Sequence, residues 1–552
     1  MDVKALSQSK LAEIRNKLET ACQGYSPNPK YKYLAEISAL DLQRELLALK
    51  KQNPIDNKLS EAISQFHERQ RIDQNRYMAL TDVLTKEALK KAEEIEAKIT
   101  PNNRQDFPLY GFILSLKDSI NQKGYPSNCG LVANMQVWEK ETPFIDYIES
   151  KGAVFISRAN VPQMLFAIES WNNIFGNTSN AYDHNRVAGG TTGGDAVLIA
   201  LGHVNGAIGS DFAGSLRVPA LFNGICAMNT TAKRIDRSAH ATMFEQTKYF
   251  SILPEGQYKL VGTIGPMAKN VDDLEVLTKV LFDYNQVNSR IAPVSWRTNL
   301  LPVKRVGVVV EWDHLFELTE TNRRAMAMTR EVLHKAGIET VDFDMRSYVI
   351  DLVQAVCSIF YKDNYINAAL TGSVDLHEPL LPMLKNFQQV LTFPKLVIAF
   401  LLKVLRDQKK TIFLKAFYDS LNYNEMHFTK IIDGIRDRMV KQMKDLGIEM
   451  LLCHGMMPAV LKETTNDTNL WAMYTLIWNG LRFAGGALPV TRVREDEQYY
   501  NSKFNGIFES SMRRCMNGSA GLPVGIQVIS FSWREEMILK LMKILETGLQ
   551  FK

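Results

Sequence analysis

Short apolar runs that alternate with helical patterns dominate the chain from Leu109 to its end. Each run is bounded by glycine or polar turn residues, and its length suits a buried strand. The runs are GFILSLK, GAVFISRA, NGAIGS, VGVVVEW, IEMLLCH, GALPVTRV and VGIQVIS. Buried strands that alternate with helices are typical of an α/β protein built on one extended sheet. The sequence therefore predicts an α/β fold.

The first hundred residues have a different pattern. Apolar residues recur at three- and four-residue spacing in Leu11–Ala21, Leu40–Leu49 and Met78–Ile99, which predicts helices. The turn sequence Pro101-Asn102-Asn103 ends this region.

Three parts of the chain follow from these patterns. Residues 1–104 are predicted to form an N-terminal helical region, and residues 105–552 an α/β domain. Residues 380–420 interrupt the alternation of strands and helices, and we interpret them as an insertion.

Composition excludes several classes of protein. Of 552 residues, 46% are hydrophobic and 23% are charged, as in ordinary globular proteins. The net charge of +5 is too small to indicate a nucleic-acid partner. Six scattered cysteines, with no CxxC pair and no set of cysteine and histidine ligands at metal-binding spacing, indicate a reducing compartment and no metal site.

The N-terminal sequence MDVKALSQSKLAEIRNKLET is polar and amphipathic. It lacks the apolar core of a signal peptide, and the chain contains no apolar run of 18 residues. We therefore expect neither a signal peptide nor a transmembrane helix.

A glycine-rich loop, AGGTTGGD at residues 188–195, suggests a phosphate cradle at first sight. A phosphate-binding P-loop places a lysine after its last glycine, but Asp195 stands at that position. A carboxylate at the positive end of a helix dipole would repel an anion. The dinucleotide-binding pattern GxGxxG is also absent from this stretch. The loop is therefore not interpreted as a nucleotide site.

Three side chains around this loop suggest a different chemistry. Lys117 ends the apolar run LYGFILSLK, and burial of an amine lowers its pKa and makes it a base. Ser215 follows Thr191 by 24 residues, within GSDFAGSLRVPALFNG. A lysine base, a hydroxyl relay and a serine nucleophile form a catalytic unit without histidine. Taken singly, Lys117 would suit a surface position at a strand end, and Ser215 a helix cap.

The run GGTTGGDAVLIALGHVNGAIGSDFAGSLRVPALFNGIC resembles the signature of the amidase signature family, GGSSGGE…GTDIGGSIRIPA…CGIC. LYGFILSLKD, NVPQ, GTIGPMAKNVDDLEVL and GLPVGIQVI continue the likeness in the family's order, from about residue 105 to the C-terminus. The resemblance implies the amidase signature fold, a single large mixed sheet surrounded by helices. It also implies amide hydrolysis without a metal or cofactor.

The matching positions imply roles for individual residues. Ser215 matches the nucleophile, Lys117 the base, and Thr191 the relay hydroxyl that follows a cis peptide bond. The family's oxyanion hole is built from backbone N–H groups before the nucleophile, which here are those of Phe212, Ala213, Gly214 and Ser215. The segment that holds them also contains Asp211 and Arg217, which we interpret as structural partners that brace the nucleophile loop.

The sequence departs from the family pattern at two positions near the reaction. Thr191 stands where serine is usual; it keeps the hydroxyl, but its β-methyl restricts χ1. We expect reduced or altered activity rather than none. Ala213 replaces a usual glycine in the oxyanion loop.

The inserted segment contains an amphipathic pattern, TFPKLVIAFLLKVLRDQKKTIFLK. On a helix, its charged residues fall within about 160° of arc, with apolar residues on the opposite side. They are Lys395, Lys403, Arg406, Asp407, Lys409 and Lys410. The segment from Lys385 to Lys415 contains seven basic residues and one acidic residue. This pattern predicts a cap that binds an anionic membrane surface. The alternative is an amphipathic helix packed on the core.

Within the family, the fatty acid amide hydrolases carry a hydrophobic, basic-rimmed cap at this point of the chain, and Leu421–Val493 is also similar to them. This resemblance implies a peripheral enzyme on the cytoplasmic side of an internal membrane that cleaves N-acyl ethanolamines and related lipid amides. Met164, Leu165 and Phe166 match positions near the substrate site. A homodimer is expected, because it would place two caps on one membrane face.

Two other functions stay open at this point. One is an amidase for small soluble amides, which would need no affinity for lipid vesicles. The other is a catalytically weakened lipid-binding protein, suggested by Thr191.

Overall fold

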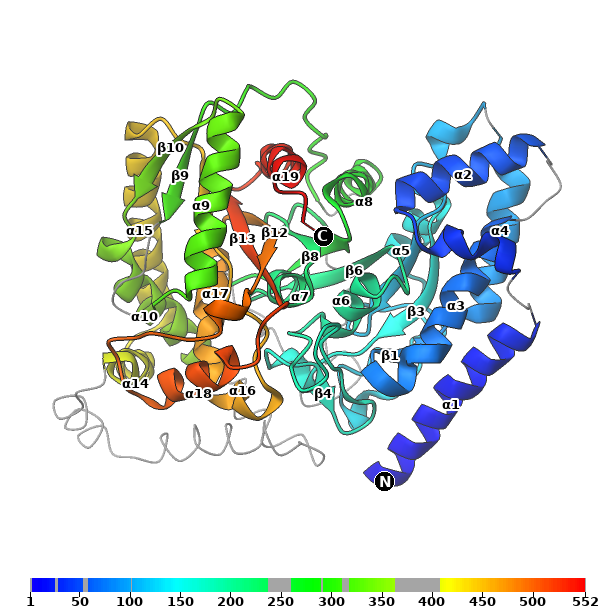
Figure 1. Cartoon of the computed structure of the whole chain (residues 1–552), viewed down its shortest axis with the longest axis horizontal. Helices are drawn as coiled ribbons and strands as arrows, with labels where there is room; N and C mark the ends of the chain where they lie inside the picture. Colours follow the sequence, from blue (N-terminus) through cyan, green and yellow to red (C-terminus); the bar gives the residue numbers. More distant parts are fainter. Residues whose placement is uncertain are drawn as a thin grey trace.

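The computed structural model describes residues 2–24, 28–52, 58–100, 102–236, 260–288, 291–309, 317–362 and 408–551. Within these residues, one sheet of eleven strands crosses the molecule, with helices packed around it (Figure 1). Its strand order is β1-β3-β2-β6-β8-β7-β12-β13-β11-β9-β10. The predicted α/β fold with one large sheet is confirmed.

The strands of this sheet are short and mostly buried. They are β1 Leu80–Val83, β2 Ile113–Lys117, β3 Val154–Ala159, β6 Gly206–Asp211, β7 Cys226–Asn229, β8 Thr263–Ala268, β9 Arg305–Val309, β10 Glu339–Phe343, β11 Met450–His454, β12 Ala484–Arg492 and β13 Pro523–Ser530. A separate two-stranded pair consists of β4 Trp171–Asn172 and β5 Gly176–Asn177. All seven apolar runs predicted as strands form strands of the large sheet.

The sheet contains both parallel and antiparallel pairs of strands, so it is mixed, as the family resemblance implied. β2 lies parallel to β3 and β6, whereas β6 and β7 are both antiparallel to β8. β12 is antiparallel to β7 and β13, and β9 is parallel to β10 and β11. Because β2 and β6 are parallel neighbours, the ends of both strands, Lys117 and Asp211, lie at the same edge.

The helices vary from a single turn to six turns. They are α1 Val3–Gly24, α2 Ala39–Gln52, α3 Lys58–Tyr77, α4 Thr85–Lys98, α5 Pro143–Ser150, α6 Gly193–Ala200, α7 Arg217–Asn223, α8 Val271–Asp283, α9 Glu320–Lys335, α10 Arg346–Lys362, α14 Gln408–Asn422, α15 Glu425–Asp445, α16 Thr465–Thr468, α17 Met473–Gly480, α18 Ile507–Met516 and α19 Glu535–Leu549. In Figure 1, α1–α4 lie around the β1 end of the sheet, and α9, α10 and α15 around the β10 end.

Two neighbouring glycines in β12 show how helices cover both faces of the sheet. A Cβ on Gly486 would lie 2.2 Å from Met542 of α19, and one on Gly485 would point toward Arg217 of α7. Successive residues of a strand face opposite sides of a sheet, so α7 and α19 cover opposite faces. The face of α7 also holds α6 and α17, whose contacts with the strands bring the loops of the candidate site together.

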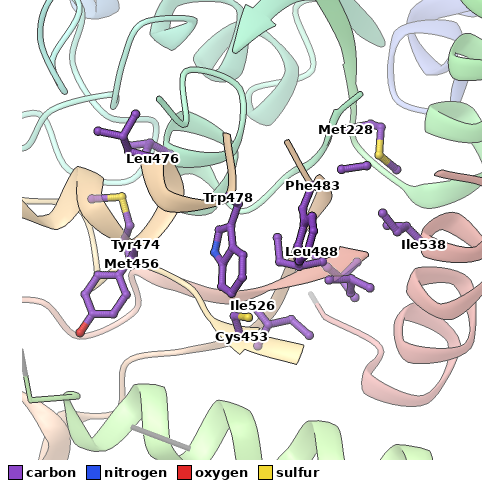
Figure 2. Close-up of a cluster of buried hydrophobic side chains, with 14 of the residues drawn as sticks. Met228, Cys453, Met456, Tyr474, Leu476, Trp478, Phe483, Leu488, Ile526 and Ile538 are labelled. Atoms are coloured by element: carbon purple, nitrogen blue, oxygen red, sulfur yellow. The ribbon is translucent and has the colours of Figure 1, made fainter. Parts of the chain in front are cut away.

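α17 is anchored in the core by large side chains. Trp478 and Tyr474 are buried, and Figure 2 shows Trp478 beside Phe483 and above Ile526 and Cys453. The rings of Trp478 and Phe483 stack with centroids 6.4 Å apart. Burial of such large rings fixes the helix firmly against β11 and β13.

The predicted helix over Met78–Ile99 is wrong in its first third. Leu80–Val83 forms β1, which pairs antiparallel with β3 at the edge of the large sheet, and α4 begins only at Thr85. The apolar spacing of this short stretch fits a strand as well as a helix, and pairing with β3 decides between them. Residues 1–104 therefore supply an edge strand as well as helices, while the domain boundary at residue 104 stays a prediction.

The predicted cap, residues 380–420, lies outside the described residues as far as Asp407. Its last part, from Gln408, begins α14, which packs against α10. None of the helices in the described ranges combines the length and the apolar character needed to cross a bilayer.

Candidate active site

The side chain of Lys117 lies at the end of β2 and is fully buried. Its Nζ donates to Thr191 Oγ1 at 2.6 Å, to Ser210 Oγ at 3.0 Å and to the Ser210 carbonyl oxygen at 3.2 Å. Three oxygens from two other segments therefore hold the amine in one place, and one of them is the predicted relay hydroxyl.

Burial lowers the pKa of Lys117 from its ordinary value to about 7. The nearby carboxylates of Asp195 and Asp211 raise this pKa, but they do not outweigh the loss of solvent around the charged amine. A large share of Lys117 is therefore neutral at neutral pH, and a neutral amine can accept a proton.

The glycine-rich loop owes its composition to close packing. A Cβ on Gly190 would lie 2.4 Å from the Ala167 carbonyl oxygen, and one on Gly193 would lie 2.3 Å from Ser170 Oγ. A Cβ on Gly194 would lie 2.4 Å from the Asn160 nitrogen. The two glycine pairs thus let the loop lie directly on the backbone after β3.

The two threonines between the glycine pairs face the strand ends. The Gly190–Thr191 peptide bond is cis, as the family resemblance implied, and Thr191 contacts Lys117. The backbone N–H of Thr192 donates to the Ser215 carbonyl oxygen at 3.1 Å. The structure therefore places the Thr191 hydroxyl against Lys117 and bonds the next residue of the loop, Thr192, to the backbone of Ser215. The catalytic roles of Lys117, Thr191 and Ser215 stay predictions.

A buried ion pair shapes the nucleophile loop between β6 and α7. Arg217 Nε lies 3.1 Å from Asp211 Oδ2, and both side chains are fully buried. The same carboxylate accepts the N–H groups of Gly214 at 2.8 Å and Leu216 at 3.2 Å. Burial by itself raises the pKa of Asp211, but Arg217 and these N–H groups hold it below its ordinary value. The interpretation of Asp211 and Arg217 as partners that brace this loop is confirmed.

The predicted oxyanion donors are not equivalent. The Gly214 N–H, predicted to face the substrate, donates instead to Asp211, because the loop turns inward to complete the ion pair. The N–H groups of Phe212, Ala213 and Ser215 have no protein acceptor within the described part of the chain. These three are the donors that stay available for a ligand oxygen.

Met164 lies on the segment after β3 that also packs against the glycine-rich loop. It is buried and adopts a left-handed conformation with φ of 58°, and its N–H donates to the Cys129 carbonyl oxygen at 2.9 Å. Leu165 and Phe166 follow it and are half-buried. The role of Met164 in substrate binding stays a prediction.

Two polar residues near Lys117 were not singled out from the sequence as partners of the site. Ser210 supplies two of the three oxygens around the amine. Ser115 Oγ donates at 2.5 Å to Asp195, whose pKa is raised by burial to about 7. Neither belongs to a pattern of catalytic residues, and only the packing of β2, β6 and α6 brings them together. Across the described residues, no three His, Cys, Asp or Glu side chains converge as a metal site would require.

Comparison with known proteins identifies the family. The family model described as Amidase matches residues 61–539. The chain belongs to the amidase signature family. It is an amidase-family hydrolase.

Relatives of two kinds are similar to this amidase. Fatty-acid amide hydrolase 1 of Sus scrofa is 28% identical over 452 residues, covering 79% of this chain and 75% of the relative. An amidase of Gibberella zeae is 27% identical over 519 residues, covering 90% of this chain and 89% of the relative. A solved structure of a fatty acid amide hydrolase superposes with a TM-score of 0.74 at 20% identity, covering 99% of this chain and 94% of that one, which shows the shared fold.

The ion pair of the nucleophile loop gives a stability prediction. Arg217→Ala leaves the Asp211 carboxylate buried without its counter-ion, so we expect the free energy of unfolding to fall by about 3–5 kcal/mol. Chemical denaturation measures it. The matched control is Arg514→Ala, which breaks an exposed pair with Glu463 and should cost less than about 1 kcal/mol. Equal effects of the two variants would show that the buried pair does not hold the loop.

Proposed function

We propose that this protein is a serine amidase that hydrolyses fatty acid amides, such as N-acyl ethanolamines, to a free fatty acid and an amine. The observation that carries the proposal is the fully buried Lys117, whose amine bonds to Thr191 at 2.6 Å, on a loop that is itself bonded to Ser215. A lysine with a pKa of about 7, bonded to a hydroxyl on a loop that also bonds to the backbone of Ser215, supports activation of that serine through the hydroxyl.

The proposed reaction begins with neutral Lys117. Its Nζ takes the Thr191 hydroxyl proton while Thr191 Oγ1 takes the proton of Ser215, and Ser215 Oγ attacks the amide carbon. The negative charge that develops on the carbonyl oxygen is stabilised by N–H groups of Phe212, Ala213 and Ser215. As the C–N bond breaks, the relay returns the proton to the leaving amine. Water then attacks the acyl ester through the same relay and releases the acid.

Two features support lipid amides as the substrate class. One is the similarity to fatty-acid amide hydrolase 1 of Sus scrofa over 79% of the chain. The other is the basic, amphipathic pattern of residues 380–420, which suits an anionic membrane surface. In this proposal the enzyme is peripheral on the cytoplasmic side of an internal membrane, and a homodimer would place two caps on one membrane face.

An amidase that acts on small soluble amides is the second candidate. The amidase of Gibberella zeae matches a larger share of the chain at nearly the same identity. The third possibility, a weakened lipid-binding protein, rests on Thr191 alone, and Thr191 keeps the hydroxyl bonded to Lys117.

The first experiment is turnover of acyl ethanolamides over a series of chain lengths in detergent. We expect kcat/KM to rise with chain length, because a longer chain buries more apolar surface, by about 0.8 kcal/mol per methylene. Ser215→Ala should abolish turnover of every member. Equal rates for acetamide and long-chain amides would favour the small-amide candidate, and lipid binding without turnover would favour the weakened homologue.

The pH dependence of kcat/KM tests the base. Lys117 is protonated and inactive below its pKa of about 7 and neutral above it, so activity should rise toward pH 7 and level off above it. Lys117→Met should lower activity and remove the rise of kcat/KM toward pH 7. The control Lys123→Met changes an exposed lysine paired with Glu141 and should leave the profile unchanged. A profile that keeps this rise in Lys117→Met would assign the titration to another group.

Flotation with vesicles that contain anionic phospholipid tests the cap. The double charge reversal Lys403→Glu and Arg406→Glu should weaken binding, because each basic residue near such a surface contributes about 1 kcal/mol. Lys86→Glu and Lys90→Glu reverse two exposed charges on α4 and serve as the matched control. Equal binding of both double variants would remove the cap from the proposal.

A further inference from the structure

The peptide group that joins Ala213 to Gly214 is held at both ends. Its carbonyl oxygen accepts a hydrogen bond from Thr475 Oγ1 at 2.5 Å, which is shorter than the 2.9 Å from the same hydroxyl to the Ala472 carbonyl oxygen of its own helix. Its N–H donates to Asp211 Oδ1 at 2.8 Å. A peptide group is planar and rigid, so these two bonds fix its orientation.

Thr475 also fills the space in front of this peptide. Gly214 has φ of +115°, and a Cβ built on it would lie 2.1 Å from Thr475 Oγ1 and 2.5 Å from Thr475 Cβ. Thr475 is fully buried. The side chain and the loop are therefore in direct contact, which only glycine permits at position 214.

α17 presents a second group to the same loop one turn later. Asn479 Nδ2 donates to Asp211 Oδ1 at 3.2 Å, and Asn479 Oδ1 accepts from Arg217 Nη2 at 2.5 Å. Residues four apart share one face of a helix, so Thr475 and Asn479 form a single contact surface.

The helix that carries this surface is itself fixed in place. Gln527 of β13 donates to the Tyr474 carbonyl oxygen at 3.1 Å and accepts from Arg217 Nη1 at 3.1 Å. Tyr474 and Trp478 anchor α17 in the apolar core (Figure 2). The loop is thus bonded to a rigid support.

We propose that Thr475 is a positioning residue for catalysis: its hydroxyl orients the Ala213–Gly214 peptide and thereby aims the flanking N–H groups of Ala213 and Ser215 at the substrate carbonyl oxygen. These two N–H groups belong to the peptides on either side of the clamped one, and neither has a protein acceptor among the described residues. The inference rests on the proposed serine amidase function.

A donor that is aimed at a developing oxyanion acts mainly in the transition state. Loss of the Thr475 hydroxyl should therefore lower kcat and leave KM nearly unchanged. If the Thr475 hydroxyl were needed only for folding, its loss would instead lower the thermal stability of the protein and the amount of active enzyme.

The experiment compares three substitutions of Thr475 in the full-length protein with an acyl ethanolamide as substrate. Thr475→Val replaces the hydroxyl with a methyl group beside the carbonyl oxygen, Thr475→Ala removes it without added bulk, and Thr475→Ser keeps it. We expect kcat to fall about 10- to 100-fold in the Val and Ala variants, with KM within about twofold. Removal of an oxyanion donor lowers kcat by a factor of about 10²–10³, and the effect here should be smaller because the donors are misaligned and not removed. Thr475→Ser should stay within about threefold of the unsubstituted protein.

Thr278→Val is the matched control. Thr278 is a buried helical threonine whose hydroxyl, within the described part of the chain, bonds only to the Leu274 carbonyl oxygen of its own helix, α8. Its kcat should be unchanged. The rate at which a fluorophosphonate labels Ser215, measured on the folded fraction, gives a second readout that should fall in Thr475→Val and Thr475→Ala and recover in Thr475→Ser.

Retention of kcat and labelling rate within twofold in both Thr475→Val and Thr475→Ala would overturn the inference, as would an equal loss in Thr475→Ser. Ser215→Ala separates this result from a failure of the proposed function. If Ser215→Ala is inactive and the Thr475 variants behave like the unsubstituted protein, only the role of Thr475 is wrong. If Ser215→Ala stays active, the serine mechanism is wrong, and the role of Thr475 falls with it.

Discussion

The buried ion pair between Asp211 and Arg217 is the interaction on which the candidate site depends. The Asp211 carboxylate accepts hydrogen bonds from two backbone N–H groups of the nucleophile loop. The Arg217 guanidinium donates to Asn479 of α17 and to Gln527 of β13. A charge without solvent must be satisfied by hydrogen bonds, so the chain folds the loop inward around it. The position of Ser215 at the start of α7 follows from that fold.

Lys117 is the second buried cation of the candidate site, and its surroundings differ from those of Arg217. Among the described residues, no carboxylate forms a direct ion pair with its amine. Three neutral oxygens accept its hydrogen bonds instead, and burial lowers its pKa to about 7. Arg217 thus holds the nucleophile loop through an ion pair, while Lys117 can gain or lose a proton near neutral pH. The glycine-rich loop lies between Lys117 and the nucleophile loop. Its glycines allow close packing, so that Thr191 bonds to Lys117 and Thr192 bonds to the Ser215 carbonyl oxygen.

Much of the fold was predictable from local pattern. The seven apolar runs form strands because each is long enough to be buried on both faces, as in β2 and β13. β1 and β7, four residues each, carry too little pattern to be recognised and are strands only because a neighbour pairs with them. α3 lies within the predicted helical region but was not singled out by its own pattern, since it buries polar side chains such as Gln70 and Gln74 that mask its helical periodicity. In these cases, pairing and burial outweigh local preference.

The sequence by itself indicated the family and the α/β fold, and it singled out Lys117, Thr191 and Ser215 as the candidate catalytic residues, because motif order and residue type are local properties of the chain. Only the tertiary structure decided that the Gly214 N–H is used by Asp211, that Ser210 surrounds Lys117, and that Thr475 clamps the loop. The contacts of Ser210 and Thr475 join residues that lie 93 and 262 positions apart, and the contact of Gly214 with Asp211 depends on how the loop turns inward. Their hydrogen-bond geometry and burial exist only once the strands and α17 have packed, and so they leave no mark in the spacing of the residues.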